Sequence, residues 1–372
     1  MRILFLSDLL AYGGASKLIC DLLPRMEKKG NDCELLILTD EHSKYIEELQ
    51  NANVKVEVVP KDIKGHWKKI QYIKQKIEKG GYDIIHANLF PVMYYCSIVK
   101  RMLGKKCPPL IMTEHSTDNR RRHKFYLRGV ERFVYSNYTH VVSISEKTQE
   151  NLTSWLRAKG DERFSVIANG IDVGGFQNAE PLSKNHICND HMEKDVLLLT
   201  VGSFTPQKNH IKLIEALKIL PENFKLLLCG EGPLESEIRQ RVIDLDLNAR
   251  VFFLGFRKDI ARIMHTADIL VIPSIWEGFG LIAAEGMACG IPIAASDVPG
   301  LSEVIGDAGI KFNPQSSEEI CEAIKKLITK EYRDPLIQKG HQRVTLYDIN
   351  ETVAGYLSLY ERYYTLARHI VK

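Results

Sequence analysis

The chain alternates short apolar runs with longer stretches in which apolar residues recur at helical spacing. Amphipathic helices are indicated, for example, over Ala15–Lys29 and His66–Lys79. The apolar runs of the first half predict buried strands at Arg2–Leu6, Asp32–Leu38, Val54–Val59, Ile84–Ala87, Leu110–Thr113, His140–Ile144 and Phe164–Ile167. Strands that alternate with helices predict a parallel sheet with helices on both faces.

The second half repeats this scheme after a stretch of little periodicity. Strands are predicted at Val196–Val201, Lys225–Cys229, Val251–Leu254, Ile269–Ile272, Ile291–Ala295 and Ile310–Phe312. Helices are predicted at His210–Leu220, Leu234–Leu245, Ile260–Thr266, Leu281–Cys289, Ser317–Thr329 and Ile349–Arg368. The segment between the halves contains Gly-Gly, Pro181, Asn and Ser, a composition typical of a linker.

These patterns predict an α/β protein with two doubly wound, Rossmann-like domains that face a cleft. The first would span residues 1–175, a linker 176–194, and the second domain 195–348, with a C-terminal helix at 349–372 crossing back to the first domain. Ligands of doubly wound sheets bind outside the carboxyl ends of the strands. We therefore expect the chemistry in the loops that follow the strands.

Composition and charge narrow the class of protein. Of 372 residues, 45% are hydrophobic and 26% are charged, as in ordinary globular proteins, and no apolar run approaches the length of a membrane span. The first apolar run is too short for a signal peptide. The eight cysteines form no C-x-x-C pair, so we expect reduced thiols, no zinc site and a cytoplasmic protein.

Charge is distributed unevenly between the halves. Residues 1–170 carry 28 Lys and Arg against 20 Asp and Glu, a net +8, whereas the remainder carries a net −5. A basic half favours attraction to an anionic substrate or surface, although a solvated Lys-rich surface explains most of these residues equally well.

The strongest candidate for chemistry is the stretch from Pro273 to Glu285, PSIWEGFGLIAAE. It follows an apolar strand and opens a helix, whose first N–H groups and dipole form a site suited to phosphate. Its two glycines let the backbone approach a ligand closely. Glu285 falls about one turn into the helix, where a carboxylate can accept both hydroxyls of a ribose, while Glu277 lies in the turn.

This stretch resembles the signature of the family 4 retaining glycosyltransferases, which have the GT-B fold. The E-x7-E element from Glu277 to Glu285 matches, as do the motifs GMACGIP at 286–292 and PGLSE at 299–303. Further matches are IANGID at 167–172 and Gly13-Gly14-Ala15, so the resemblance covers nearly the whole chain. It implies transfer of a sugar from a nucleotide-diphosphate sugar to a glycan or lipid-linked acceptor.

The resemblance also implies roles for individual residues. Glu277 would hold the donor sugar and Glu285 the ribose. The N–H groups of Leu281 and Ile282, after Gly280, would meet the diphosphate. His115, directly after the apolar run Leu110–Met112, would hydrogen-bond a sugar hydroxyl.

A second loop, VGSFTPQKN at 201–209, also follows a strand and precedes a helix. Lys208 could reach the diphosphate and stabilise the charge that grows on it as it leaves. The family usually has an Arg where this chain has Ser203. Either Lys208 and backbone amides suffice, or another cation replaces the Arg. Arg257, which the resemblance places near the nucleobase, is the candidate.

The first half supplies weaker candidates. The turn Tyr12-Gly13-Gly14-Ala15 could cap the diphosphate with its amides. His86 and Asn88 could line an acceptor pocket. The basic run from Asn119 to Lys124, NRRRHK, could bind an anionic lipid-linked acceptor or anionic membrane headgroups, or it could be a solvated loop. No aromatic residues interleave with the run, so nucleic acid is not an expected partner.

The mechanism that fits is transfer with retention of anomeric configuration and without a metal ion or other cofactor. It needs stabilisation of the leaving phosphate and orientation of two substrates, rather than a nucleophilic carboxylate. The alternatives are a nucleotide-sugar 2-epimerase of the same fold, an NAD-dependent oxidoreductase, and an inactive binding protein. The absence of a G-x-G-x-x-G fingerprint argues against the oxidoreductase.

Overall fold

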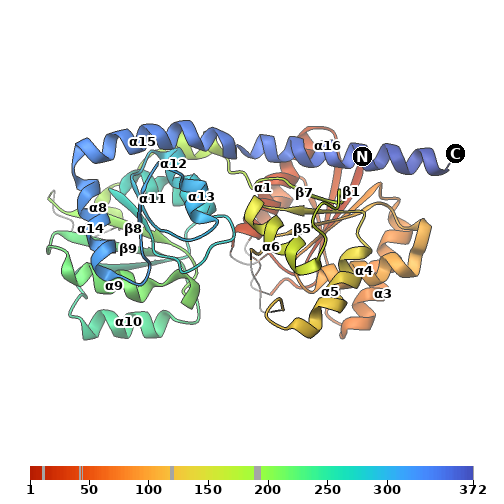
Figure 1. The fold of residues 1–372 in the computed structure, drawn as a ribbon, viewed down its shortest axis with the longest axis horizontal. Coiled ribbons are helices and arrows are strands. Elements are labelled where there is room, and N and C mark those ends of the chain that lie inside the picture. Colours follow the sequence, from red (N-terminus) through yellow and green to blue (C-terminus); the bar gives the residue numbers. More distant parts are fainter. Residues whose placement is uncertain (11–12, 42, 44, 118–120, 188–193, 372) are drawn as a thin grey trace. The chain divides into compact units, whose positions relative to one another are not determined.

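The computed structural model describes residues 1–10, 13–41, 43, 45–117, 121–187 and 194–371 (Figure 1). The chain forms two compact units. The first unit comprises Met1–Gly170 and Ile349–Lys372, and the second comprises Ile171–Asp348. Each unit has its own parallel sheet and its own hydrophobic core.

The sheet of the first unit has seven parallel strands in the order β3-β2-β1-β4-β5-β6-β7. The strands are β1 Arg2–Ser7, β2 Asp32–Ile37, β3 Lys55–Val58, β4 Ile84–Asn88, β5 Leu110–Glu114, β6 His140–Ser143 and β7 Phe164–Val166. The helices and 3₁₀ turns are α1 Gly14–Lys28, α2 Ile46–Asn51, α3 His66–Gly80, α4 Val92–Leu103, η1 Gly104–Lys106, η2 Phe125–Leu127, α5 Arg128–Ser136, α6 Glu146–Leu156 and α16 Ile349–Val371.

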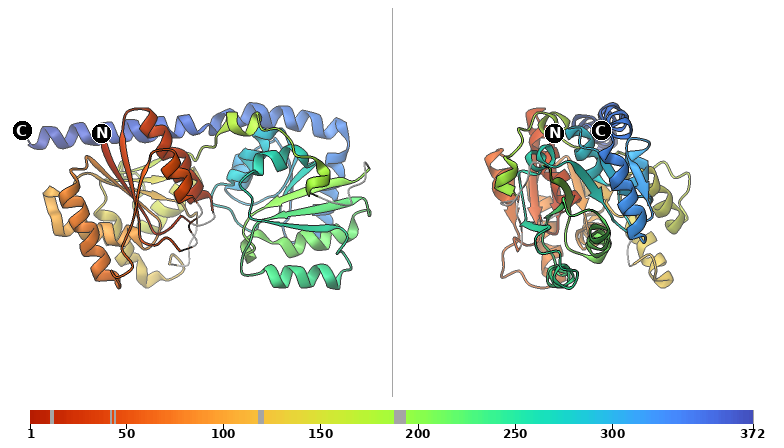
Figure 2. Two further views of the ribbon diagram at one scale, coloured as in Figure 1. Left: turned by 180° about the vertical axis from the view of Figure 1, so that it is seen from behind. Right: turned by 90° about the vertical axis from the view of Figure 1, so that its left-hand side faces the viewer.

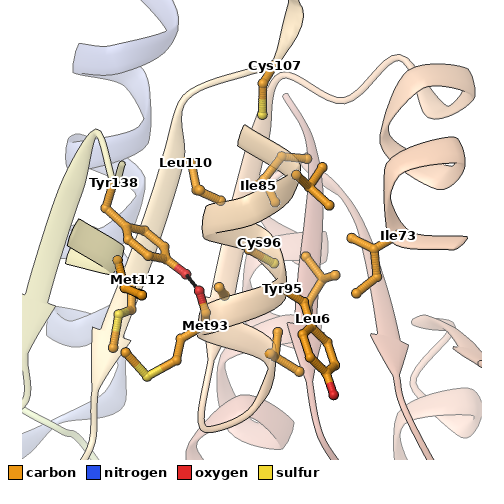
Figure 3. Close-up of a cluster of buried hydrophobic side chains, with 14 of the residues drawn as sticks. Leu6, Ile73, Ile85, Met93, Tyr95, Cys96, Cys107, Leu110, Met112 and Tyr138 are labelled. Carbon is orange, nitrogen blue, oxygen red and sulfur yellow. Dashed lines mark hydrogen bonds between the residues drawn. The ribbon is translucent and has the colours of Figure 1, made fainter. Parts of the chain in front are cut away.

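Successive residues of each strand point to opposite faces of the sheet, so the core of the first unit has one layer on each face. Leu4 and Leu6 of β1 pack with α3, α4, α5 and α6, whereas Ile3 and Phe5 pack with α1, α2 and α16. Figure 3 shows part of the first layer, including the hydrogen bond of 2.6 Å that the Tyr138 hydroxyl donates to the Met93 carbonyl. The sheet is therefore covered on both faces, as the apolar strand runs predict.

A buried polar network fixes α16 on the sheet of the first unit. His86 of β4 contacts the Tyr360 hydroxyl through Nδ1 and the Thr113 hydroxyl through Nε2, at 2.8 Å for the latter. The Tyr356 hydroxyl lies 2.8 Å from the same Thr113 oxygen. These contacts confirm that the C-terminal helix returns to the first domain. His86 is 1% exposed, so its predicted place in an acceptor pocket is wrong; it is a core residue.

The sheet of the second unit has six parallel strands in the order β10-β9-β8-β11-β12-β13. The strands are β8 Val196–Val201, β9 Phe224–Cys229, β10 Val251–Gly255, β11 Ile269–Ile272, β12 Ile293–Ser296 and β13 Ile310–Phe312. The helices and 3₁₀ turns are α7 Val173–Gln177, α8 Lys184–Ile187, η3 Pro206–Lys208, α9 His210–Ile219, α10 Glu235–Asp244, α11 Ile260–Thr266, α12 Leu281–Cys289, α13 Leu301–Ile305, α14 Ser317–Ile328, α15 Lys330–Val344 and η4 Thr345–Tyr347.

The boundary between the units differs from the sequence-based division. The first unit ends at Gly170 rather than at residue 175, and the segment read as a linker lies within the second unit. Its α7 packs on α12, the Leu182 N–H donates 2.8 Å to the Thr266 hydroxyl, and Lys184 pairs with Asp268 at 3.2 Å. These contacts are made by side chains and backbone groups without apolar periodicity, which explains why the sequence pattern does not reveal them.

The prediction of two doubly wound α/β domains is confirmed. Every predicted strand is present, with ends that agree to within about two residues, the usual uncertainty of element boundaries. Several helices were not assigned individually from the sequence, among them α5 and α15. Helix α15 contains Pro335 and lies where apolar positions are sparse.

The buried imidazole of His86 should make stability depend on pH. Burial lowers the pKa of His86 from 6.5 to about 3, so the folded protein keeps it neutral. The unfolded chain takes up this proton once the pH falls below 6.5, and the folded protein does not until about pH 3. We expect the free energy of unfolding to fall by about 2 kcal/mol between about pH 7 and pH 5 for this group alone.

Urea unfolding at several pH values checks this expectation. His86→Asn should be less stable near neutral pH but should show a shallower fall toward acid. His369→Asn, which changes an exposed histidine of α16, should keep the wild-type slope. A wild-type slope in the His86 variant would contradict the assignment.

Candidate functional site

The residues predicted to hold the donor lie in the second unit, at the carboxyl ends of β8 and β11. These two strands are neighbours in the sheet, yet the chain leaves one toward β9 and the other toward β12. Such a topological switch point is where doubly wound sheets bind ligands. The sheet order thus brings the loop of Ser203 and Lys208 beside the loop of Glu277.

Three side chains meet in this place. Lys208 Nζ donates to Glu277 Oε1 at 2.6 Å, and the Ser274 hydroxyl donates to the same oxygen at 2.7 Å. The Glu277 side chain is 9% exposed and the Lys208 side chain 21%, while Ser274 is fully buried. Because the Lys208–Glu277 pair is largely buried, the attraction between its two charges offsets the cost of removing each of them from water.

The arrangement leaves one carboxylate oxygen for a ligand. No described residue hydrogen-bonds to Glu277 Oε2, so this oxygen can accept from a hydroxyl while Oε1 is held. Ser274 was not assigned a role from the sequence. Its signal would have been a hydroxyl three positions before Glu277, directly after an apolar strand.

Hydrogen bonds between the two loops fix this geometry. The Ile275 N–H donates 2.8 Å to the Gln207 carbonyl, and the Gln207 side chain donates 2.8 Å to the Trp276 carbonyl. The Asn209 amide donates to the carbonyls of Pro273 and Pro314, at 3.1 and 2.8 Å. Lys208 is therefore presented by a cross-linked turn rather than by a free loop.

The start of α12 adjoins Glu277 in the chain. Gly280 precedes the helix with φ +92°, and a Cβ there would lie 2.9 Å from a methyl group of Leu301, so a glycine is required. Gly280 has no side chain to cap the helix, and the N–H groups of the first turn lack intrahelical partners by geometry. Leu281 and Ile282 thus supply amides suited to an anion.

Glu285 lies one turn further along α12, on the same helix face as Leu281. Its side chain is half-buried. Burial raises the pKa of the Cys289 thiol to about 12, and the negative charge of Glu285 adds to that rise. The carboxylate is therefore placed within about one turn of the amides that begin the helix, as the predicted ribose contact requires.

Ser203 and Arg257 are the two residues linked to the missing family Arg. Ser203 lies half-buried in the turn after β8, where its carbonyl accepts from the Thr205 N–H at 2.8 Å. The Arg257 guanidinium makes two hydrogen bonds to Asp259, at 2.8 and 2.7 Å. To replace the missing cation, Arg257 would have to leave this carboxylate or bind phosphate together with it.

The candidates of the first unit gather at the carboxyl ends of β4 and β5. His115 Nε2 lies 3.0 Å from Asn88 Oδ1, so Nε2 carries the proton and donates. Burial lowers the pKa of His115 to about 4, which leaves the ring neutral. Nδ1 then has a lone pair and no described partner, so it can accept from a hydroxyl. Asn88 is 2% exposed, so its predicted place in the lining of an acceptor pocket is wrong as well; it orients His115.

The glycine turn of the first unit follows β1. Gly13 precedes α1 with φ +146° and makes no side-chain cap, and Gly14 is the first residue of the helix. A Cβ at Gly13 would meet nothing within 4 Å, so space remains beside this helix start. Tyr12, the first residue of the predicted turn, lies outside the described residues.

The basic run differs from its prediction where the structure describes it. Asn119 and Arg120 lie outside the described residues. Arg121 pairs with the buried carboxylate of Glu131 at 2.8 Å, and Arg122 pairs with that of Glu114 at 3.0 Å. Arg121 and Arg122 thus neutralise carboxylates within the unit rather than present an unpaired anion site, because both glutamates are buried.

One sequence feature of the second unit is relevant to metals. The chain contains one Asp-x-Asp, Asp244-Leu245-Asp246, a spacing that some glycosyltransferases would use for a metal. It lies at the end of α10, before β10 begins, and therefore at the edge of the sheet opposite the loops above. Within the described ranges no group of three or more His, Cys, Asp or Glu could hold a metal ion.

Comparisons with known proteins bear on both units. The model of the family "Glycosyl transferases group 1" matches residues 184–343, and that of "Glycosyltransferase Family 4" matches residues 12–174. An uncharacterized glycosyltransferase of Methanocaldococcus jannaschii is 30% identical over 97% of this chain and 98% of its own length. None of the helices in the described part of the chain is long and apolar enough to cross a membrane.

Two further proteins are similar to this chain, one in sequence and one in fold. The UDP-Gal:alpha-D-GlcNAc-diphosphoundecaprenol alpha-1,3-galactosyltransferase of Escherichia coli is 27% identical over 60% of this chain and 60% of its own length. The crystal structure of Anabaena HepE with UDP and glucose superposes with a TM-score of 0.83, at 22% identity, over 97% of this chain and all of HepE. At this identity, the likeness to HepE shows the fold.

The buried ion pair can be tested without any ligand. Lys208→Ala should lower the free energy of unfolding by about 2 kcal/mol because it strands the Glu277 carboxylate. The double variant Lys208→Ala/Glu277→Ala should cost less than the sum of the single changes, and urea unfolding of the four proteins measures the coupling. The exposed pair of Lys339 and Asp307 serves as control and should show coupling below about 1 kcal/mol. Strict additivity at 208 and 277 would argue against the pair.

Proposed function

This chain belongs to the family 4 glycosyltransferases of the GT-B fold, and from that membership we propose that it transfers a sugar from a nucleotide-diphosphate sugar, with retention of configuration and without a metal ion. The observation that carries the proposal is the meeting of Lys208, Glu277 and Ser274 beside the start of α12. A cation, free amides and an unused carboxylate oxygen suit a sugar bound to a diphosphate.

In this proposal each group of the second unit has one partner on the donor. Lys208 and the amides of Leu281 and Ile282 bind the diphosphate. Glu277 Oε2 accepts from a sugar hydroxyl, and Glu285 accepts from the ribose. The Lys208–Glu277 ion pair holds the ammonium in place before the donor arrives, so little reorganisation is needed when charge develops.

The proposed reaction exchanges one bond of the anomeric carbon for another. The bond from that carbon to the diphosphate oxygen breaks, and a bond to the acceptor hydroxyl oxygen forms on the same face of the sugar. The departing phosphate oxygen takes the hydroxyl proton. Lys208 and the helix amides stabilise the negative charge on the leaving diphosphate, which is the main service that such a reaction needs from the protein.

The first unit is proposed to serve the sugar and the acceptor. Neutral His115, whose Nδ1 has no partner among the described residues, would accept from a sugar hydroxyl, and the amides after Gly13 and Gly14 would face phosphate. The E. coli relative is named for an acceptor linked to undecaprenol diphosphate. We propose an acceptor of the same class, a lipid-linked or growing glycan, and a place in cell-surface polysaccharide synthesis.

One observation favours an alternative activity at the proposed donor site. Ser203 stands where the family usually has an Arg, and Arg257 is engaged by Asp259. A protein with a weakened leaving-group site could bind nucleotide sugars without transferring them, or could act on the donor alone as a 2-epimerase. Incubation with donor alone and with donor plus acceptor separates these activities by their products.

Replacing Lys208 or Glu285, the proposed phosphate and ribose contacts, should impair sugar transfer while the protein remains folded. A thermal-shift screen with nucleoside diphosphates would first identify the base. With the matching donor, Lys208→Ala should lower turnover by about 100-fold or more, because a charge-stabilising contact is lost in the transition state. Glu285→Ala should weaken donor binding. Exposed positions of the same unit provide matched controls, Lys339→Ala and Glu322→Ala, and should keep wild-type activity. Wild-type-like transfer by the Lys208 variant would refute its role.

Removal of divalent ions tests the metal-free mechanism separately. Because an ammonium and helix amides take the place of a metal in the proposal, excess EDTA should leave turnover within about twofold of the untreated enzyme. Loss of activity that Mg²⁺ or Mn²⁺ restores would contradict it. Nuclear magnetic resonance of the fresh product gives the anomeric configuration and tests retention.

A further inference from the structure

Large apolar side chains are exposed in one stretch of the first unit. Seven of the fifteen exposed large hydrophobic residues of the described chain fall between residues 90 and 133, so they are gathered rather than scattered. They are Phe90, Ile98, Met102, Phe125, Tyr126, Val130 and Phe133. Phe125 is 81% exposed and Tyr126 62%, on the short turn η2.

Helical spacing places these side chains on one side of the unit. Ile98 and Met102 lie one turn apart on the outward face of α4, and Val130 and Phe133 lie one turn apart on the outward face of α5. The two helices pack against each other, and both cover the same face of the sheet (Figures 1 and 2). The Arg101 guanidinium lies 4.8 Å from the Phe133 ring centre and joins the two outward faces.

We call this surface the α4–α5 face and define it by the apolar residues Ile98, Met102, Phe125, Tyr126, Val130 and Phe133 and the basic residues that border them. Those exposed basic residues are Arg101, Lys105, Lys106, Lys124 and Arg132. Phe125 and Tyr126 meet edge to face, with ring centres 5.9 Å apart.

The charge of the α4–α5 face has one sign. The only carboxylates of the described residues between 90 and 136 are Glu114 and Glu131, and both are buried. Glu114 is paired with Arg122 and Glu131 with Arg121, so these acids add no negative charge to the face. Among the described residues of this stretch, no exposed carboxylate therefore balances the exposed lysines and arginines.

We propose that the α4–α5 face docks on a bilayer that contains anionic lipids. Exposed aromatic and aliphatic side chains would enter the boundary between headgroups and acyl chains, and the flanking Lys and Arg would attract the anionic headgroups. A protein partner fits less well, because protein interfaces are depleted in lysine relative to the rest of the surface, whereas the α4–α5 face includes Lys105, Lys106 and Lys124. With no spanning helix in the described chain, the contact would be peripheral.

The position of the face suits the proposed acceptor. The turn η2 follows β5, and β5 ends at Glu114, next to His115. Phe125 and Tyr126 therefore leave the sheet at the carboxyl edge where the acceptor is expected. Docking there would present a lipid-linked diphosphate sugar to the first unit. This use rests on the proposed function, whereas binding to lipid vesicles does not.

The membrane surface proposed here is not the one that the basic run suggested. Of the described residues in that run, Arg121 and Arg122 pair with buried glutamates, and Lys124 alone belongs to the α4–α5 face. The main contributors are instead apolar side chains of α4, η2 and α5, which no charge count reveals.

Vesicle flotation with the full chain tests the proposal. The wild-type protein should float with vesicles of phosphatidylethanolamine and phosphatidylglycerol and should bind vesicles of phosphatidylcholine at least about tenfold more weakly. Phe125→Ser/Tyr126→Ser and Lys105→Glu/Lys106→Glu should each reduce binding to the anionic vesicles by about tenfold or more. Added salt should weaken binding of the wild-type protein.

Matched changes on the second unit control for loss of any exposed aromatic or any two lysines. Tyr332→Ser alters a side chain that is 58% exposed, and Lys325→Glu/Lys326→Glu reverses two exposed charges of α14. Both should bind anionic vesicles like the wild-type protein. A cooperative urea-unfolding transition like that of the wild-type protein shows that each variant is folded. Nucleoside-diphosphate binding, measured separately, keeps a failed proposed function distinct from a failed docking surface.

Two results would overturn the proposal. One is a wild-type protein that fails to float with anionic vesicles at low salt, or that floats equally well after the changes at 125–126 and 105–106. The other is a dimer in solution that Phe125→Ser/Tyr126→Ser converts to a monomer, which would assign the face to a second copy of the chain.

Discussion

The site in the second unit depends on one carboxylate, Glu277, which is almost withdrawn from solvent and is compensated by one ammonium and one hydroxyl. Burial of a charge is costly, so Lys208 and Ser274 are needed for the turn after β11 to exist in this form. The same pair positions a cation beside the open start of α12. Stability and anion recognition therefore draw on one interaction, and the sheet order supplies it by placing β8 next to β11.

The first unit also buries titratable side chains, but it buries them in the neutral form. His86 is buried under α16 and satisfied by Thr113 and Tyr360, whereas Nδ1 of His115 has no hydrogen-bond partner among the described residues. Both rings are neutral because burial disfavours the charged form. One histidine thus fixes the returning helix, and the other can receive a hydroxyl. The exposed apolar residues of α4, η2 and α5 take no part in these buried contacts, and they stabilise neither core.

Much of the fold follows from the sequence because buried parallel strands are marked by continuous apolar runs. The loops after those strands also identify Lys208, Glu277 and Glu285, since unusual residues stand out there. What the sequence did not reveal depends on contacts distant in the chain. Ser274 gains its meaning only from a hydrogen bond, His86 from a helix about 270 positions later, and Arg121 and Arg122 from buried acids. Hydropathy and local spacing carry no record of such partners.

A crystal structure of this protein with a bound nucleoside diphosphate tests the central claim most directly. We expect diphosphate oxygens within hydrogen-bond distance of Lys208 Nζ and of the amides at 281 and 282, with the ribose hydroxyls on Glu285. A nucleotide bound elsewhere on the chain, or a diphosphate held by Arg257 with Lys208 still turned wholly to Glu277, would contradict it.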